Sequence, residues 1–179
     1  EGGQGLVLAG KILAEAAAIY QGINATQSQS YGPEARGGAS RSEVILSDED
    51  IDYPKAVQLD LLLALTQEAA DRYTTDLKPN GILLVDSDAV QRVQSGSFRV
   101  YRAPVIRAAR EKIGREIVAN IVSLGIITRI AGIVSEDAVR EAILTRVPKG
   151  TEEINMKAFE EGLAMADQLV SQGAEKPTA

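Results

Sequence analysis

Hydrophobic residues in the N-terminal part of the chain alternate between helical and strand-like spacing. From Leu6 to about Tyr20, apolar side chains recur on one face of a predicted helix, at Leu8, Ile12 and Ile19 among others. Residues 24–30 are polar and suggest a short strand at the edge of a sheet. Residues 42–46 place Val44 and Leu46 on one side, which predicts another strand.

Two short apolar runs further along the chain indicate buried strands. The first, 59–65, is followed by Thr66, a good N-cap for a helix from Gln67 to about Thr75. The second, 82–85, follows Lys78-Pro79-Asn80-Gly81, whose composition is typical of a turn. A further strand is expected over 98–101, ending before Pro104.

The C-terminal part of the chain is predicted to be helical. Residues 116–133 are apolar nearly all round, which indicates burial in a core or at a subunit interface. Small residues there, including Ser123 and Gly125, would let another helix approach closely and suggest a homodimeric contact. Ser135 should cap a helix that runs to about Arg146, and a last helix is expected over 152–170.

Alternating strands and helices predict an α/β protein with a largely parallel sheet covered on both faces. The 179 residues are expected to form one domain over 1–172, followed by a flexible tail over 173–179.

Two glycine-rich segments are the strongest candidates for a binding site. Gly2-Gly3-Gln4-Gly5 opens directly into the first helix, where unpaired backbone N–H groups and a partial positive charge favour phosphate or carboxylate. Such turns usually follow a buried strand, so we expect a strand ahead of Glu1 that lies outside this sequence. A structural role in a tight corner is equally open, and Leu8 stands where a dinucleotide fingerprint has glycine or alanine.

The second segment, Tyr31 to Gly38, carries charged and aromatic side chains. Arg36 and Arg41 could pair with phosphates, with a surface salt bridge to Glu34 or Glu43 as the alternative. Tyr31 is either a stacking platform or a loop anchor.

Several polar residues stand at predicted strand ends, where α/β sheets place their ligands. Thr66, Gln67, Asp86 and Ser87 are candidates of this kind, although a cap or turn role is the simpler interpretation of each. Asn120 lies within the apolar 116–133 segment, and we expect a structural amide with a hydrogen-bond partner.

The composition excludes several kinds of chemistry. There is no Cys and no His, so the chain offers no thiolate ligands for an iron–sulfur cluster and no Ser–His or Cys–His catalytic pair. We identify no catalytic residue and no metal ligand set. The net charge of −6 argues against nucleic acid as a partner. No stretch approaches the ~20 apolar residues of a membrane span, and we expect a cytoplasmic protein.

Four ordered motifs together resemble the gamma subunit of 2-oxoacid:ferredoxin oxidoreductases. They are the glycine turn at 2–5, the Ser-Tyr-Gly-Pro-Glu-Ala-Arg-Gly-Gly segment at 30–38, Leu-Ala-Leu-Thr-Gln-Glu-Ala at 63–69, and Asn-Ile-Val-Ser-Leu-Gly at 120–125. The resemblance spans about residues 2 to 170, and the 30–38 segment looks most like the 2-oxoglutarate type. The departure from the family is the absence of the first strand.

The resemblance implies a three-layer α/β/α fold and a role in oxidative decarboxylation of a 2-oxoacid with coenzyme A, giving an acyl-CoA, CO₂ and reduced ferredoxin. Thiamine diphosphate and iron–sulfur clusters would reside on alpha, beta and in some cases delta subunits, and ferredoxin would meet the assembled complex. Coenzyme A would be contacted by Gly3, Gln4 and Gly5 through backbone amides and by Arg36 and Arg41. Other residues assigned to its site are Tyr31, Gly37, Gly38, Thr66 and Gln67.

Two other functions are compatible with the same residues. The chain could be a pure assembly module whose glycine loops are contact surfaces. It could also be an independent nucleotide-binding protein, although the incomplete fingerprint disfavours that interpretation.

Overall fold

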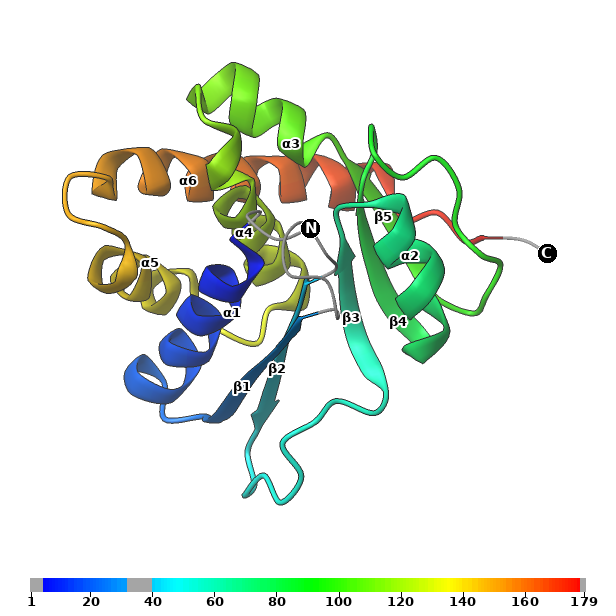
Figure 1. Cartoon of the computed structure of the whole chain (residues 1–179), viewed down its shortest axis with the longest axis horizontal. Helices are drawn as coiled ribbons and strands as arrows, with labels where there is room; N and C mark the ends of the chain where they lie inside the picture. The colour runs from blue at the N-terminus through cyan, green and yellow to red at the C-terminus, as the bar shows by residue number, and fades with distance from the viewer. Residues whose placement is uncertain (1–4, 32–39, 178–179) are drawn as a thin grey trace.

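The structure is a computed structural model, and it describes residues 5–31 and 40–177 (Figure 1). The strands are β1 (Asn24–Tyr31), β2 (Ser40–Ser47), β3 (Leu59–Ala64), β4 (Leu77–Asp86) and β5 (Arg99–Ala103). The helices are α1 (Leu6–Glu15), α2 (Gln67–Tyr73), α3 (Val105–Ala108), α4 (Ala119–Ala131), α5 (Glu136–Arg146) and α6 (Glu152–Gln172). Helices α1 and α3 continue as π turns over Ala16–Tyr20 and Ala109–Ile113, and short 3₁₀ turns cover Thr74–Asp76 and Glu116–Val118.

Strands β3, β4 and β5 form a parallel sheet in that order. Successive residues of β3 face opposite sides, so Leu61 and Leu63 join the core under the larger group of helices while Leu62 packs on the α2 side. Helix α2 covers one face, and α1, α3, α4 and α6 lie toward the other (Figure 1). The predicted α/β fold with a parallel sheet covered on both faces is thus confirmed.

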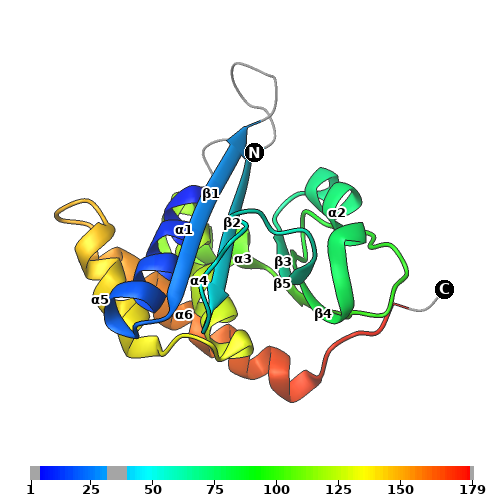
Figure 2. The same cartoon turned by 90° about the horizontal axis from the view of Figure 1, so that it is seen from below.

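The first two strands form a separate antiparallel hairpin, in a register from Asn24 opposite Ser47 to Tyr31 opposite Ser40. The sequence predicts both strands but not their separation from the parallel sheet, which Figure 2 shows from below. Helix α1 packs on this hairpin, and a Cβ at Gly10 would lie 2.3 Å from the Ser42 hydroxyl. Close approach at this glycine therefore positions α1 on β2.

The turn predicted at 78–81 does not precede the strand, because these residues lie within β4. The pairing of β3 with β4 passes from Leu59–Leu77 to Leu61–Ile82 and skips the four residues between them on β4. Asn80 takes a positive φ of 63°. The turn-forming residues thus make a bulge in a strand that begins before them.

Helix α4 packs against α6 at a point where both helices have glycine. A Cβ on Gly125 would lie 2.4 Å from the Phe159 carbonyl oxygen, and one on Gly162 would lie 2.1 Å from the Val122 carbonyl oxygen. The small residues of the 116–133 segment therefore accommodate α6 of the same chain. Only near its ends does the segment expose large apolar side chains, at Ile117 and Ile133.

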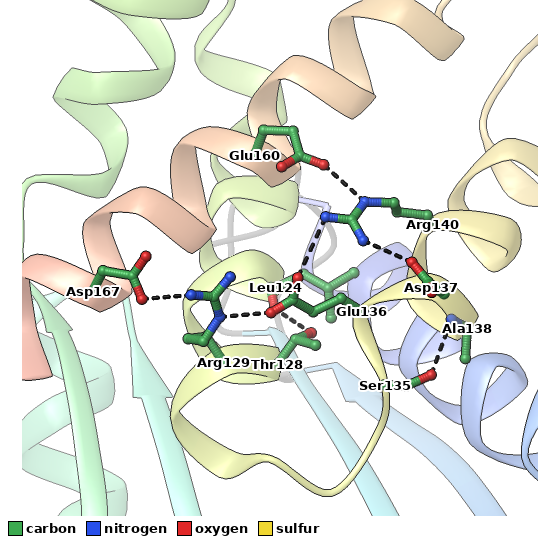
Figure 3. A network of polar contacts seen from close by, with 10 residues as sticks. All are labelled: Leu124, Thr128, Arg129, Ser135, Glu136, Asp137, Ala138, Arg140, Glu160 and Asp167. Atoms are coloured by element: carbon green, nitrogen blue, oxygen red, sulfur yellow. Dashed lines mark hydrogen bonds and ion pairs between the residues drawn. The ribbon is translucent and has the colours of Figure 1, made fainter.

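Ion pairs across α4, α5 and α6 hold the helical layer together (Figure 3). Arg129 of α4 binds Glu136 of α5 at 2.6 Å and also Asp167 of α6. Arg140 of α5 donates to Glu160 of α6 at 2.8 Å. The hydrogen bond to Glu136 is the main cause that raises the pKa of the Arg129 guanidinium, and the hydrogen bond to Glu160 is the main cause for Arg140. Both side chains therefore stay charged throughout the accessible pH range.

The residues after α6 contact the edge of the sheet. Glu175 exchanges two backbone hydrogen bonds with Val100 of β5, at 2.8 and 2.9 Å, and its carboxylate accepts from Arg102 at 3.1 Å. The tail that we predicted to be flexible from 173 is therefore attached at Glu175.

Candidate functional site

The described residues include five of the ten predicted binding residues. Gly5 precedes α1, Tyr31 ends β1, and Arg41 lies in β2. Thr66 and Gln67 stand where β3 leads into α2. The other five lie outside the described residues, namely Gly3, Gln4, Arg36, Gly37 and Gly38.

Gly5 is the N-cap of α1 and takes a left-handed conformation, with a φ of 68°. Its carbonyl oxygen accepts from the Ala9 amide at 3.2 Å, which closes the first helical turn, and from the Asn120 side chain at 2.9 Å. The first turn of α1 has no side-chain cap and no acidic residue. An uncapped helix start of this kind favours an anion, and the predicted binding of an anion at this helix end stays a prediction.

Asn120 joins the start of α1 to the start of α4. Only 3% of the residue is exposed. Its Nδ2 donates to Gly5 and its Oδ1 accepts from the Ile121 amide at 2.9 Å. The expected structural amide is confirmed, and its partner, which no local pattern in the sequence indicates, is the glycine turn.

Arg41 is engaged within the protein. Its guanidinium forms an ion pair with Glu43 and lies 5.1 Å from the centre of the Tyr73 ring, at the end of α2. Arg72 lies over the same ring at 5.5 Å. The alternative interpretation of Arg41, a salt bridge to Glu43, is confirmed. The cation–π contact also connects the hairpin to the helix that covers the parallel sheet.

Thr66 and Gln67 both hold local structure. The Thr66 hydroxyl accepts from the Ala69 amide at 3.2 Å, as the predicted N-cap should. The Gln67 side chain donates to Asp71 at 2.8 Å and to the Arg92 carbonyl at 2.9 Å, and accepts from the Gln91 and Arg92 amides. These side chains fix the loop after β4 onto α2, so the structure favours the structural interpretation of both.

Asp86, at the end of β4, is fully buried and organises two connections. Its Oδ1 accepts from the amides of Asp88 and Ala89 at 3.0 and 2.9 Å, and its Oδ2 accepts from the Ile106 amide at 2.9 Å. The predicted turn role is confirmed. The sequence does not reveal the contact with Ile106, at the start of α3.

The described candidates make no direct polar contact with one another. No hydrogen bond or ion pair joins any two of Gly5, Arg41, Thr66 and Gln67. In the ranges 5–31 and 40–177, no group of three or more acidic residues could hold a metal ion. None of the helices in that part of the chain is long and apolar enough to cross a membrane. Among the described candidates, Gly5 stands at an uncapped helix start, and the side chains of Arg41, Thr66 and Gln67 are engaged in contacts within the protein.

Comparison with known families matches this chain over nearly its whole length. The description of the matching family is pyruvate ferredoxin/flavodoxin oxidoreductase, and the match covers residues 1–165. The chain belongs to this family. The 2-oxoglutarate synthase subunit KorC of Methanocaldococcus jannaschii is 51% identical over 170 residues, which are 94% of this chain and 91% of that protein.

Solved structures agree with this family. The gamma subunit of a keto/oxoacid ferredoxin oxidoreductase from Geobacter sulfurreducens PCA superposes with a TM-score of 0.84 and 54% identity, over 93% of this chain and 94% of that one. A 2-oxoglutarate:ferredoxin oxidoreductase from Magnetococcus marinus, solved with 2-oxoglutarate, coenzyme A and succinyl-CoA bound, superposes with a TM-score of 0.81. At 21% identity, over 94% of this chain and 30% of that one, the latter establishes a shared fold. The resemblance to gamma subunits of 2-oxoacid:ferredoxin oxidoreductases is confirmed.

Proposed function

We propose that this chain is the gamma subunit of a multi-subunit 2-oxoglutarate:ferredoxin oxidoreductase and that it contributes to coenzyme A binding. The observation that carries the proposal is the 51% identity to a 2-oxoglutarate synthase subunit over 94% of this chain and 91% of that protein. Because this relative matches almost the whole chain, we favour the subunit role over that of an independent nucleotide-binding protein.

The chain depends on other subunits for the chemistry of the reaction. It has no cysteine with which to hold an iron–sulfur cluster. Thiamine diphosphate, on a partner subunit, supplies the decarboxylation chemistry when bound. Alpha and beta subunits are the proposed partners, with a delta subunit in some assemblies, and ferredoxin takes electrons from the complex. If two gamma subunits meet through the 116–133 segment, the exposed Ile117 and Ile133 are the side chains available for it.

Coenzyme A carries a diphosphate and a 3′-phosphate, and the N-terminal turn suits such groups. The proposed contacts are backbone amides of Gly3, Gln4 and Gly5, at a helix start that lacks a side-chain cap and an acidic residue. The positively charged Arg36 is the proposed partner of a phosphate group of coenzyme A. Because the Arg41 guanidinium already contacts Glu43 and Tyr73, we assign it to shaping the neighbouring loop.

The subunit proposal is tested by purifying the tagged protein anaerobically from its native host. We expect thiamine- and cluster-bearing partners to copurify in a complex that oxidises 2-oxoglutarate with coenzyme A. A colourless protein that elutes alone would refute the proposed function.

The coenzyme A role is tested separately in the assembled complex with Arg36→Ala. Losing the counter-charge should raise the KM for coenzyme A while the subunits still assemble. Arg110→Ala is a matched control, since the Arg110 side chain is exposed and forms a long ion pair with Glu116, at 4.0 Å. Unaltered coenzyme A kinetics in the Arg36 variant would contradict the proposed role of this residue in coenzyme A binding.

A further inference from the structure

A hollow with an apolar lining lies at the surface where α5, α6 and the π turn after α3 meet. Its volume is about 680 Å³, and its apolar residues are Ile113 of the π turn, Leu144 of α5 and Met156 of α6. Figure 1 shows the first half of α6 between α5 and the helix that begins at α3. We call this hollow the α5–α6 groove.

The apolar side chains of the α5–α6 groove come from three separate elements. Ile113 and Met156 are partly buried and pack against the main core, whereas Leu144 is 45% exposed. The core of the protein therefore continues to the surface here. An exposed apolar patch bordered by polar side chains is typical of a surface that another protein covers, and methionine adapts readily to the shape of a partner.

Glutamates predominate at the border of the groove. The charged residues there are Glu152, Glu153, Glu160, Glu161, Lys112 and Lys157. Helical spacing places Glu152 and Glu160 one turn before and one turn after Met156, on the same face of α6. Four carboxylates against two ammonium groups leave an excess of two negative charges.

Ion pairs within the protein do not cancel this excess. Lys112 pairs with Glu161, and Lys157 pairs with Glu153, so each lysine of the border serves one carboxylate. Glu160 pairs with Arg140 of α5, a guanidinium that also serves Glu136 and Asp137. The border therefore remains negative, next to further acidic residues of α5.

The charge of the border distinguishes the possible occupants of the groove. The phosphate groups of coenzyme A are negative and would be repelled there. A two-fold dimer of this chain would use the same surface of both copies and would bring two acidic borders together. A protein segment that carries lysine or arginine beside an apolar side chain matches both the lining and the border.

We infer that the α5–α6 groove is a docking surface for a partner subunit of the complex, and that the docked segment places an apolar side chain in the groove and basic side chains at its border. The inference rests on the proposed function, because it names the surface through which this subunit joins the others. The apolar lining provides affinity, and the glutamates select a basic partner.

The apolar part is tested with Leu144→Asp in the tagged subunit, purified from the native host. We expect the amount of copurified partner subunits to fall about tenfold or more, because the substitution places a charge in the apolar lining. Val170→Asp is the matched control. Val170 is 57% exposed, lies outside the groove and stands two residues before the end of α6, as Leu144 stands two residues before the end of α5.

The charged part is tested with Glu153→Lys. The Glu153 side chain is 84% exposed, so its replacement should leave the melting temperature of the chain nearly unchanged. We expect weaker retention of the partner subunits and a smaller loss of them on adding salt, because the reversed charge removes an attraction that salt screens. Asp48→Lys makes the same change of charge at an exposed position after β2 and should behave like the unaltered chain.

Three outcomes would overturn the inference. Leu144→Asp and Glu153→Lys could retain the partner subunits as well as the two controls do. An unchanged response to salt in Glu153→Lys would refute the basic partner. Leu144→Asp could instead convert a dimer of this chain to a monomer without loss of the partners, which would make a second copy the occupant.

The design separates this inference from the proposed function. An unaltered chain that purifies without partners would refute the proposed function itself. Where the unaltered chain retains its partners, only the groove variants decide about the docking surface. Should Leu144→Asp fail to fold, retention of the partners by Glu153→Lys decides alone, because that side chain is almost fully exposed.

Discussion

Replacing Gly162 by alanine should move helices α4 and α6 apart. The new Cβ would lie 2.1 Å from the Val122 carbonyl oxygen and 2.9 Å from the Gly125 Cα. All of these neighbours are backbone atoms, so no side chain can turn aside and the helices must move apart. Overpacking of this kind costs about 3 kcal/mol at the upper end of its usual range, and the better helix propensity of alanine offsets up to about 1 kcal/mol.

The expected net loss is therefore about 2 kcal/mol in the free energy of unfolding. For a chain of this size that corresponds to a melting temperature about 4–8 °C lower. Both quantities are accessible from urea and thermal unfolding followed by circular dichroism. Gly125→Ala should cost a similar amount, and the double variant should cost less than the sum, since the first substitution already moves the helices apart.

Ala164→Gly provides the control for helix propensity. Ala164 is exposed in the same helix, so this reverse exchange should cost about 1 kcal/mol without any change in packing. If Gly162→Ala were as stable as the unaltered protein, or more so, the close approach of α4 and α6 would be refuted.

Two further substitutions test polar contacts at the end of β4 and between α5 and α6. Asp86→Ala should destabilise the protein by about 3 kcal/mol, because it removes a buried carboxylate that accepts from three backbone amides, including that of Ile106. Unchanged urea unfolding would contradict the described hydrogen bonds. Arg140→Ala should cost about 1–2 kcal/mol, since it removes the ion pair with Glu160 and a cation–π contact, whereas Arg107→Ala, at a simple exposed ion pair, should be nearly neutral by the same assay.

Local signals in the sequence predicted most of the elements. Thr66 and Ser135 cap helices where expected, with hydroxyls that accept from Ala69 and Ala138 at 3.2 Å. Caps depend on residues within one turn of each other, so the sequence contains the whole interaction. The short apolar run at 59–65 likewise predicted a strand, and the structure packs Leu61 and Leu63 on one side of the sheet and Leu62 on the other.

Local patterns in the sequence did not predict the contacts between distant segments of the chain. The ion pair of Arg41 with Glu43, two positions away, was one of the predicted interpretations of this residue. The contact of Arg41 with the Tyr73 ring was not predicted, because Tyr73 lies in α2, far along the chain. The turn signal at 78–81 is equally strong in a loop and in a bulge, and only pairing with β3 distinguishes them. The functional role of the 2–5 and 31–38 segments stays a prediction.

The sequence by itself therefore determined the order of helices and strands, the membership of a family and the kinds of chemistry that a chain without Cys and His cannot perform. Each of these depends on residue types or on neighbours along the chain. Only the tertiary structure decided that the hairpin stands apart from the parallel sheet, that α6 covers the apolar α4, and that Asn120 reaches Gly5. Asn120 and Gly5 are 115 positions apart, and the contact exists only because packing of the intervening helices brings the two helix starts together.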